Sequence, residues 1–285
     1  MDFEAFIQTA EKNKWNLYGI EIFENNKIIH KYGKEPDRRY PIYSATKAIT
    51  STAVGIAVSE GKFSIDASIY DYLHKEIPTE LSDKQKKDLK TITIKRLLTM
   101  SVQGYPFRPQ GENWLEFSLS CPLEAVETPV FAYSNIPAYL VGAALEKAVG
   151  QHLISWLEPR LFEPLDIKKP IYQNCPSGHF YGASGMELTV HELSKIGQVY
   201  LQNGIYQHQK ILPLEWVQQA TDIQQINREG GYGYFIWKYQ NGCRISGKWG
   251  QRCYIFPDRA LMITYLSHME HGSEDITWAV EQYLL

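Results

Sequence analysis

The pattern of apolar and polar positions changes twice along the chain. Apolar residues recur at helical spacing over residues 2–13, which predicts an amphipathic helix. Two segments rich in strand formers follow, over 16–23 and 27–31, and the polar residues between them predict a β-hairpin. Residues 44–60 are apolar or small on every side and end before Gly61, so they predict a helix that is buried all round.

Residues 65–181 have the pattern of helical segments and loops, with little alternation of apolar and polar positions. Within them, Gly104–Ser120 is loop-like and contains several aromatic residues, and a loop of this length inside a compact domain is often a binding loop. From Gly231 onward the period becomes two, which predicts strands. These strands are expected at residues 232–239, 243–248, 252–256 and 260–267, and a last helix at residues 273–280.

An isolated hairpin is marginally stable, so the N-terminal hairpin is expected to join the late strands in one sheet. The predicted fold is therefore α+β, with an antiparallel sheet flanked by terminal helices and an all-helical subdomain inserted between its halves. We expect one catalytic unit, made of an α/β subdomain from residues 1–62 plus 186–285 and a helical subdomain from residues 63–185. A site would lie at the seam between them, where clefts usually form.

Composition narrows the class of protein. The chain has 285 residues, of which 44% are hydrophobic, enough to bury a large core. Its formal charge of −3 gives no basic field for nucleic acid. No apolar run approaches the ~20 residues of a membrane span, and the N-terminus lacks the regions of a signal peptide. A cytoplasmic location is therefore expected, whereas the oligomeric state stays open.

No metal or cofactor site is predicted. The chain has no HExxH, P-loop or GxGxxG motif, and its four cysteines show no metal-binding spacing. Cys243 and Cys253 could lie on neighbouring strands, but buried free thiols are the expectation for all four in a cytosolic protein. The cysteines are Cys121, Cys175, Cys243 and Cys253.

The start of the predicted buried helix carries the first candidate chemistry. Ser44 and Lys47 are three residues apart, so on a helix their side chains share one face, with the serine at the positive end of the helix dipole. A serine beside a desolvated lysine can act as an activated nucleophile without histidine. The alternative is an N-cap serine and a surface lysine, and a second copy at Ser59 and Lys62 makes this spacing weak evidence by itself.

Two further short motifs occur later in the chain. Tyr133-Ser-Asn135 stands directly before a predicted helix, so its serine or asparagine could simply cap that helix. The same Tyr-x-Asn pattern also occurs at residues 172–174 and 239–241. Lys248-Trp-Gly250 lies among the late strands, where glycines allow a ligand to approach the backbone, although a plain turn has the same composition.

Together the three motifs resemble one family. Ser44-Ala-Thr-Lys47, Tyr133-Ser-Asn135 and Lys248-Trp-Gly250 occur in the order and rough spacing of the serine β-lactamase and penicillin-binding-protein superfamily. The Tyr-x-Asn form is similar to the branch that holds class C β-lactamases, D,D-carboxypeptidases, related esterases and nylon-oligomer hydrolases. The resemblance covers nearly the whole chain, and framework stretches agree with it at residues 93–100, 183–189, 231–237 and 255–258.

Carried over residue by residue, the resemblance implies that Ser44 is the nucleophile of an acyl-enzyme. Lys47, desolvated at the seam, would share or accept the serine proton. Tyr133 would pass the proton to the leaving group and help to activate water for deacylation. Asn135 would orient Lys47 and hold the amide side of the substrate, and Lys248 would supply positive charge near Tyr133.

The resemblance also implies an oxyanion hole made by the backbone N–H groups of Ser44 and of Gln251, the residue after Gly250. One position departs from the family pattern. Trp249 stands where the family often has Thr or Ser, which removes a hydroxyl that helps to bind the carboxylate of β-lactams and argues against their efficient hydrolysis. Lys248 is retained, so an anionic substrate is still compatible with the motif. Four other aromatic residues are candidates to line an apolar pocket with Trp249: Tyr105, Phe107, Trp114 and Tyr234.

These residues predict a serine hydrolase that acts through an acyl-enzyme on a small ester, amide or D-amino-acid peptide. A β-lactamase or a D,D-carboxypeptidase is the alternative within enzymes. A non-catalytic penicillin-binding or sensor-like domain is the alternative from another class, and the complete set of Ser44, Lys47 and Tyr133 argues against it. The expected partner is a small-molecule substrate, with no nucleic acid, membrane or cofactor.

Overall fold

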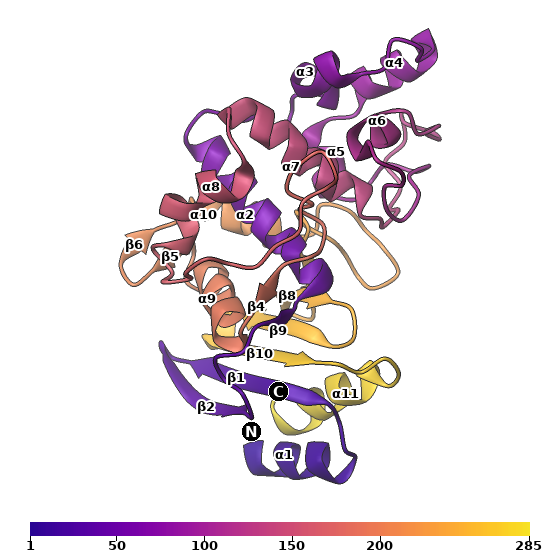
Figure 1. Cartoon of the computed structure of the whole chain (residues 1–285). Helices are drawn as coiled ribbons and strands as arrows, with labels where there is room; N and C mark the ends of the chain where they lie inside the picture. Colours follow the sequence, from indigo (N-terminus) through magenta and orange to yellow (C-terminus); the bar gives the residue numbers. More distant parts are fainter.

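The computed structural model describes all 285 residues of the chain. Its centre is one six-stranded antiparallel sheet with the strand order β2-β1-β10-β9-β8-β7 (Figure 1). The N-terminal hairpin pairs with the last strand through β1 and β10, so the predicted sheet from both ends of the chain is confirmed. The strands are β1 (Leu17–Glu24), β2 (Lys27–Gly33), β7 (Trp237–Tyr239), β8 (Gly242–Gly247), β9 (Gln251–Phe256) and β10 (Leu261–Ser267).

Helices cover both faces of the sheet. α1 (Phe3–Lys12) and α11 (Ser273–Tyr283) contact each other on one face, as predicted for the terminal helices (Figure 1). α9 (Val190–Leu201) contacts β1, β9 and β10. Alternate strand residues point to opposite faces, so Tyr254 lies in the core beneath the terminal helices, whereas its neighbour Cys253 lies in the core on the other side.

Most of the remaining helices lie between β2 and β7 in the sequence and stand above the sheet in Figure 1. They are α2 (Thr46–Ser59), α3 (Ile69–Leu73), α4 (Asp83–Thr91), α5 (Ile94–Leu98), α6 (Trp114–Leu119), α7 (Ile136–Val149), α8 (Leu153–Leu157) and α10 (Leu214–Thr221), with the short 3-10 helices η1 (Tyr43–Ala45) and η2 (His74–Glu76) and the π-helix η3 (Glu158–Phe162). A further 3-10 helix, η4 (Pro257–Arg259), connects β9 to β10. Two small antiparallel pairs complete the fold: β3 (Tyr40–Pro41) with β4 (Glu187–Leu188), and β5 (Ile205–Tyr206) with β6 (Gln209–Lys210).

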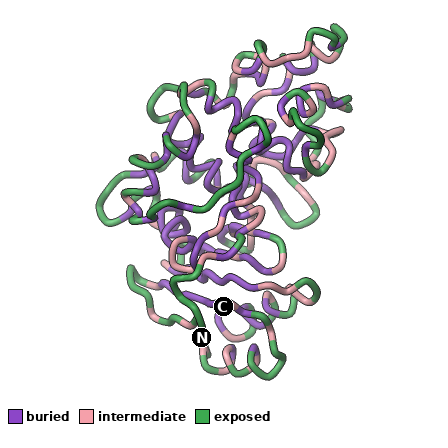
Figure 2. The backbone as a smooth tube through the Cα atoms, in the orientation of Figure 1, coloured by how far each residue is buried: buried purple, intermediate pink, exposed green.

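The helix α2 runs through the middle of the molecule. All its residues from Thr46 to Ala57 are buried, which explains why its sequence is apolar or small on every side. It packs against α7, and at Gly55 the indole of Trp216 lies where a Cβ would stand. Buried backbone therefore occupies the centre of the molecule, and exposed segments lie at its edges (Figure 2).

Two sequence predictions were wrong, one for a loop of the inserted part and one for a strand of the sheet. The second half of the expected loop at residues 104–120 is helix α6, which Asn113 begins by accepting a hydrogen bond from the Glu116 N–H. The expected strand at residues 232–239 is a strand only over its last three residues, and Tyr232 forms isolated bridges to Gln225 and Trp237. Phe235 has φ +60° and Gly233 lies against the Ala220 carbonyl, so the chain turns here instead of extending.

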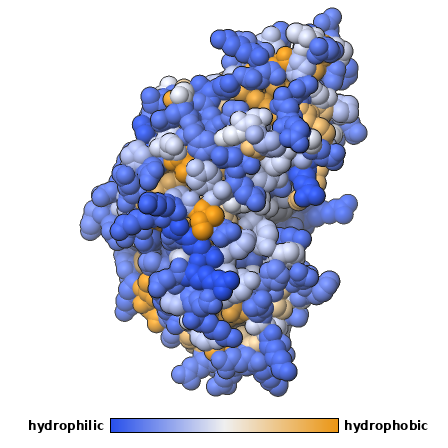
Figure 3. Space-filling view, viewed as in Figure 1, coloured by the Kyte–Doolittle hydropathy of each residue, from blue (hydrophilic) through white to orange (hydrophobic).

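The surface agrees with the mixed composition. Hydrophilic side chains predominate on the face seen in Figure 3, and apolar ones form scattered patches. None of the helices has both the length and the apolar character that a membrane crossing requires.

Candidate active site

The candidate nucleophile Ser44 lies in the short 3-10 turn η1, directly before α2. It is not the N-cap of α2, because Ala45 holds that position and no side chain caps the helix. Tyr43 has φ +48°, a conformation that is uncommon for a large side chain and that often occurs at functional sites. The α-helix was expected to start at Ser44 but starts at Thr46, and the serine lies in the 3-10 turn before it.

Lys47 is one turn further on and is 1% exposed. Its Nζ donates to three oxygens: Ser44 Oγ at 3.2 Å, Asn135 Oδ1 at 2.6 Å and the Ala183 carbonyl at 2.9 Å. All three partners are uncharged, so no negative charge offsets the loss of water around the ammonium. Burial accordingly lowers the pKa of Lys47 to about 7.

The partners of Lys47 also fix the direction of its lone pair. The Ala183 carbonyl can only accept, and the Asn135 amide oxygen faces Lys47 because its nitrogen donates to the Tyr181 hydroxyl at 2.9 Å. A neutral amine would keep its two N–H bonds on these two acceptors. Its lone pair would then point to Ser44, which is the arrangement needed to accept the serine proton.

Asn135 stands at the N-terminus of α7, yet its side chain makes no capping hydrogen bond. The Asn135 side chain therefore does not cap α7, so the alternative of a simple helix cap is wrong for it. Its backbone N–H donates to the Phe107 carbonyl at 2.7 Å, so the aromatic loop before α6 helps to hold Asn135 in place.

Tyr133 brings a phenol to the same place. The Lys47 Nζ lies 4.9 Å from the centre of its ring. Burial raises the pKa of Tyr133 to about 12, and the neighbouring Ser44 hydroxyl offsets part of that rise. Trp237 and Tyr232 pack on the ring, with centroid distances of 5.5 and 6.2 Å. Tyr133 is therefore a neutral phenol at ordinary pH.

The third motif forms the turn between β8 and β9. Gly247 pairs with Gln251 across this hairpin, and a Cβ at Gly247 would collide with the carbonyl of Ile42, just before η1. The glycine thus allows the end of β8 to lie against the turn that carries Ser44. The Gln251 side chain donates to the Ser267 carbonyl at 2.5 Å, which ties the turn to β10.

Within this turn Trp249 is half-buried, and its backbone has the left-handed conformation with φ +62°. Its ring meets Tyr43 edge-on at 5.1 Å and lies 4.4 Å from the ring of His268. The Lys248 ammonium lies over the Trp249 ring at 4.1 Å. Lys248 is exposed and its side chain forms no hydrogen bond or ion pair, so its expected role beside Tyr133 remains a prediction.

A family model described as Beta-lactamase matches residues 20–283. The chain belongs to the β-lactamase family. This match spans all three motifs and both ends of the central sheet, so the resemblance drawn from the motifs is confirmed.

Solved structures of this β-lactamase-family fold superpose over almost the whole chain. A structure titled putative β-lactamase from Bacteroides dorei is 17% identical, with a TM-score of 0.77 and coverage of 98% of this chain and 97% of that one. A putative 6-aminohexanoate-dimer hydrolase from Bacillus anthracis is 16% identical, with a TM-score of 0.77 and coverage of 97% and 79%. A D-stereospecific amidohydrolase from Streptomyces is 17% identical, with a TM-score of 0.72 and coverage of 100% and 99%. At these identities the likeness shows the fold.

Curated relatives match over a shorter region. An N-acetylmuramyl-L-alanine amidase of Bacillus subtilis is 24% identical over 170 residues, which are 55% of this chain and 38% of the relative. A probable fimbrial assembly protein of Dichelobacter nodosus is 28% identical over 178 residues, or 54% and 43%. The aligned regions thus cover less than half the length of each of these relatives.

The competing copies of the motifs lie elsewhere in this β-lactamase fold. The Ser59 hydroxyl donates to the Ile56 carbonyl at 2.7 Å at the end of α2, and Lys62 is exposed beyond it. The Asn174 side chain interacts with His152 at 3.1 Å. Only the Ser44, Lys47, Tyr133 and Asn135 copies come together in one site.

Several residues of the site were missed by the motifs. Tyr181 orients Asn135, Ala183 supplies a backbone acceptor, and Trp237 packs on Tyr133. Ala183 and Trp237 belong to framework stretches that carry the family resemblance, which is the signal that could have indicated them. Tyr234, which was expected in the pocket, is fully buried against Trp216 instead.

No group of three or more histidine, cysteine, aspartate or glutamate side chains is placed to hold a metal ion. The four cysteines are free and buried.

Proposed function

We propose that this β-lactamase-family protein is a serine hydrolase that acts through an acyl-enzyme on a small ester, amide or D-amino-acid peptide. One observation carries the proposal: the Lys47 Nζ lies 3.2 Å from Ser44 Oγ in a buried site where its pKa is lowered to about 7. Near neutral pH a large fraction of Lys47 is then a neutral amine. Such a base beside a hydroxyl is what nucleophilic catalysis by serine requires.

In the acylation step Ser44 Oγ bonds to the substrate carbonyl carbon while its proton moves to the Lys47 amine. The bond from that carbon to the leaving oxygen or nitrogen then breaks, and the leaving atom takes a proton from the Tyr133 phenol. The proton on Lys47 restores the phenol, so both side chains end neutral. Water then attacks the acyl group with the same pair as base, which releases the acid and frees Ser44.

The proposed oxyanion hole is formed by the backbone N–H groups of Ser44 and Gln251. The contact between the end of β8 and the turn that carries Ser44 supports it, because this contact brings the two segments together. Losing one such donor typically slows acyl transfer by roughly 10²–10³ fold.

The substrate class is narrowed by Trp249. Its ring packs against Tyr43, the residue before the proposed nucleophile. An aromatic surface at this place favours an apolar acyl group over the carboxylate group of a β-lactam. The names of two structural relatives, a 6-aminohexanoate-dimer hydrolase and a D-stereospecific amidohydrolase, support amides as candidates beside esters. A β-lactamase or D,D-carboxypeptidase activity is the alternative, and a rate of nitrocefin hydrolysis no better than buffer would remove the first.

The decisive experiment is intact-mass analysis after incubation with a fluorophosphonate or a fluorescent penicillin, combined with turnover of a panel of p-nitrophenyl esters. We expect a covalent adduct and ester turnover in the wild type, and neither in Ser44→Ala. A stable adduct without turnover would support the non-catalytic, sensor-like alternative. Absence of both adduct and turnover in the folded wild type would refute the nucleophile.

A further inference from the structure

A groove next to Tyr133 has no assigned role. Its volume is about 520 Å³, and it lies between residues 129–131 and residues 225–229, with Trp237 of β7 as its third wall. The segment between α10 and β7 that supplies one wall forms an open loop beside the inserted helices, in light orange in Figure 1. The groove is therefore an opening in the surface beside the candidate active site.

Two walls of the groove are continuous with the site. Trp237 packs on the Tyr133 ring at 5.5 Å, Phe131 lies 6.5 Å from the same ring, and Phe131 and Trp237 lie 5.8 Å apart. The charge of the Glu229 carboxylate also reaches Tyr133, where it helps to raise the pKa of the phenol. Phe131 and Trp237 thus both line the groove and contact the ring of Tyr133.

The groove has the chemistry of a site for an uncharged, flat, apolar group. Besides the two aromatic walls it carries Val130, 38% exposed, and Ile226, 74% exposed. The other lining residues are Pro129, Gln225, Asn227, Arg228 and Glu229, and the formal charges of this lining sum to zero. Aromatic rings gain from edge and offset contacts with such walls.

We infer that this groove is the leaving-group subsite and that the preferred substrates carry an uncharged aromatic alcohol or amine on the leaving side. The inference rests on the proposed function, because Tyr133 marks the leaving side only if it protonates the departing atom. Attack of Ser44 on such an ester forms the acyl-serine bond and breaks the bond to the aryl oxygen. The free arenol then departs through the groove, and the acyl group stays on Ser44.

The test compares two esters with the same acyl group and leaving groups of similar acidity, 2-naphthyl acetate and phenyl acetate. We expect the wild type to favour the naphthyl ester in kcat/KM by about tenfold, the scale of one good aromatic contact. Ile226→Ser, at an exposed position, should lower this ratio by roughly threefold. Trp237→Leu should bring it close to one, and the remote Trp278→Leu on α11 should leave it unchanged.

Both esters form the same acetyl-enzyme, which supplies an internal control. Deacylation measured from that intermediate should be equal for the two esters in every variant. A naphthyl-to-phenyl ratio that stays at the wild-type value in both Ile226→Ser and Trp237→Leu, while hydrolysis still depends on Ser44, would overturn the subsite and leave the proposed function intact. Loss of all Ser44-dependent hydrolysis in the wild type would instead overturn both.

Discussion

At the scale of single residues, two opposing effects act on Lys47: hydrogen bonds hold its amine in place, and burial disfavours its charge. A lysine surrounded by Asn135, Ala183 and Ser44 has hydrogen-bond acceptors but no carboxylate. The same environment that makes a charged Lys47 unfavourable for stability supports its proposed role as a base.

This predicts the pH dependence of catalysis. Because the pKa of Lys47 is about 7, kcat/KM for a neutral ester should rise with pH through about 7 and then level off, as the amine becomes neutral. Tyr133→Phe should be slower but keep this rise, since the pKa of Tyr133 is about 12. His268→Gln, beside Trp249, should also keep it. A rise that disappears in His268→Gln would assign it to the histidine and contradict the role of Lys47.

The same group predicts a pH dependence of stability. The pKa of Lys47 is about 7 in the fold and 10.5 for a free side chain, so between these values the unfolded chain binds more protons and the free energy of unfolding rises with pH. Below about pH 7 both states are protonated, and the full cost of the buried charge remains. Lys47→Met removes the titration. The free energy of unfolding, measured with urea, should therefore be higher for Lys47→Met than for the wild type. This difference should be greatest near pH 6 and should shrink toward about pH 9. A difference that does not change with pH would contradict the burial of the charge.

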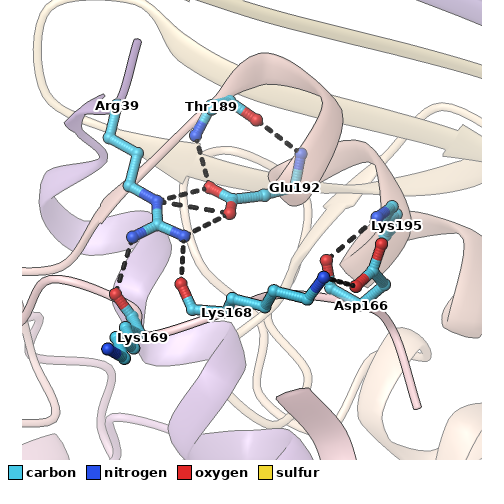
Figure 4. Close-up of polar contacts among 7 residues, drawn as sticks. All are labelled: Arg39, Asp166, Lys168, Lys169, Thr189, Glu192 and Lys195. Carbon is cyan, nitrogen blue, oxygen red and sulfur yellow. Dashed lines mark hydrogen bonds and ion pairs between the residues drawn. The ribbon is translucent and has the colours of Figure 1, made fainter. Parts of the chain in front are cut away.

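At the scale of elements, Arg39, which stands directly before β3 and η1, connects three segments of the chain (Figure 4). Its guanidinium binds both carboxylate oxygens of Glu192 and the carbonyls of Lys168 and Lys169. Glu192 also accepts the Thr189 N–H at 2.9 Å, which completes the capping box of α9. Arg39 thus joins the strand before η1 to the start of α9 and to a loop.

Removal of Arg39 should destabilise the protein through these lost contacts. The Arg39 and Glu192 side chains are 19% and 12% exposed, so solvent screens the pair in part, and Arg39→Ala should lower the free energy of unfolding by about 1–2 kcal/mol. Arg38→Ala is the matched control, because Arg38 pairs with Glu35 on the open surface and should change stability very little. Equal effects of the two substitutions in chemical denaturation would show that the Arg39 contacts contribute nothing.

How much of this fold could be predicted depends on whether the signal is local. The hairpin of β1 and β2 and the end of α2 before Gly61 could be predicted, because turns and helix ends are decided within a few residues. The turn at Phe235, by contrast, follows from its hydrogen bond to the Leu98 carbonyl, which no local pattern reveals. Helix α6 was missed because it is only six residues long.

For the site, the three-residue spacing could indicate Ser44 and Lys47 as a pair, but Ser59 and Lys62 have the same spacing. What separates them is the tertiary environment: the first lysine is buried against Asn135 and Ala183, and the second, Lys62, is exposed. The order of the three motifs supplied this information indirectly. Tyr181 gave no sequence signal, because its role is defined only by its contact with Asn135.

At the scale of the whole molecule, one core connects the sheet to the inserted helices. A cluster of 68 buried residues extends from Ile245 in β8 to Leu145 in α7, with α2 between them. All four cysteines belong to this cluster, with Cys121 and Cys175 in the inserted part and Cys243 and Cys253 in the sheet. A shared core of this size favours one cooperative unfolding transition over separate unfolding of the two predicted subdomains.

The four thiols can report that cooperativity directly. Burial raises the pKa of Cys121 to about 11 and of Cys243 and Cys253 to about 12, so these three thiols are neither accessible nor ionised in the native state. We expect no thiol to react with a disulfide reagent in native buffer, and all four to become alkylated at one urea midpoint in peptide-level mass spectrometry. Earlier labelling of Cys121 and Cys175 would mean that the inserted helices open first. Since Asn135 and Ala183 come from that part, such an opening would also separate the partners of Lys47 and inactivate the enzyme before the sheet unfolds.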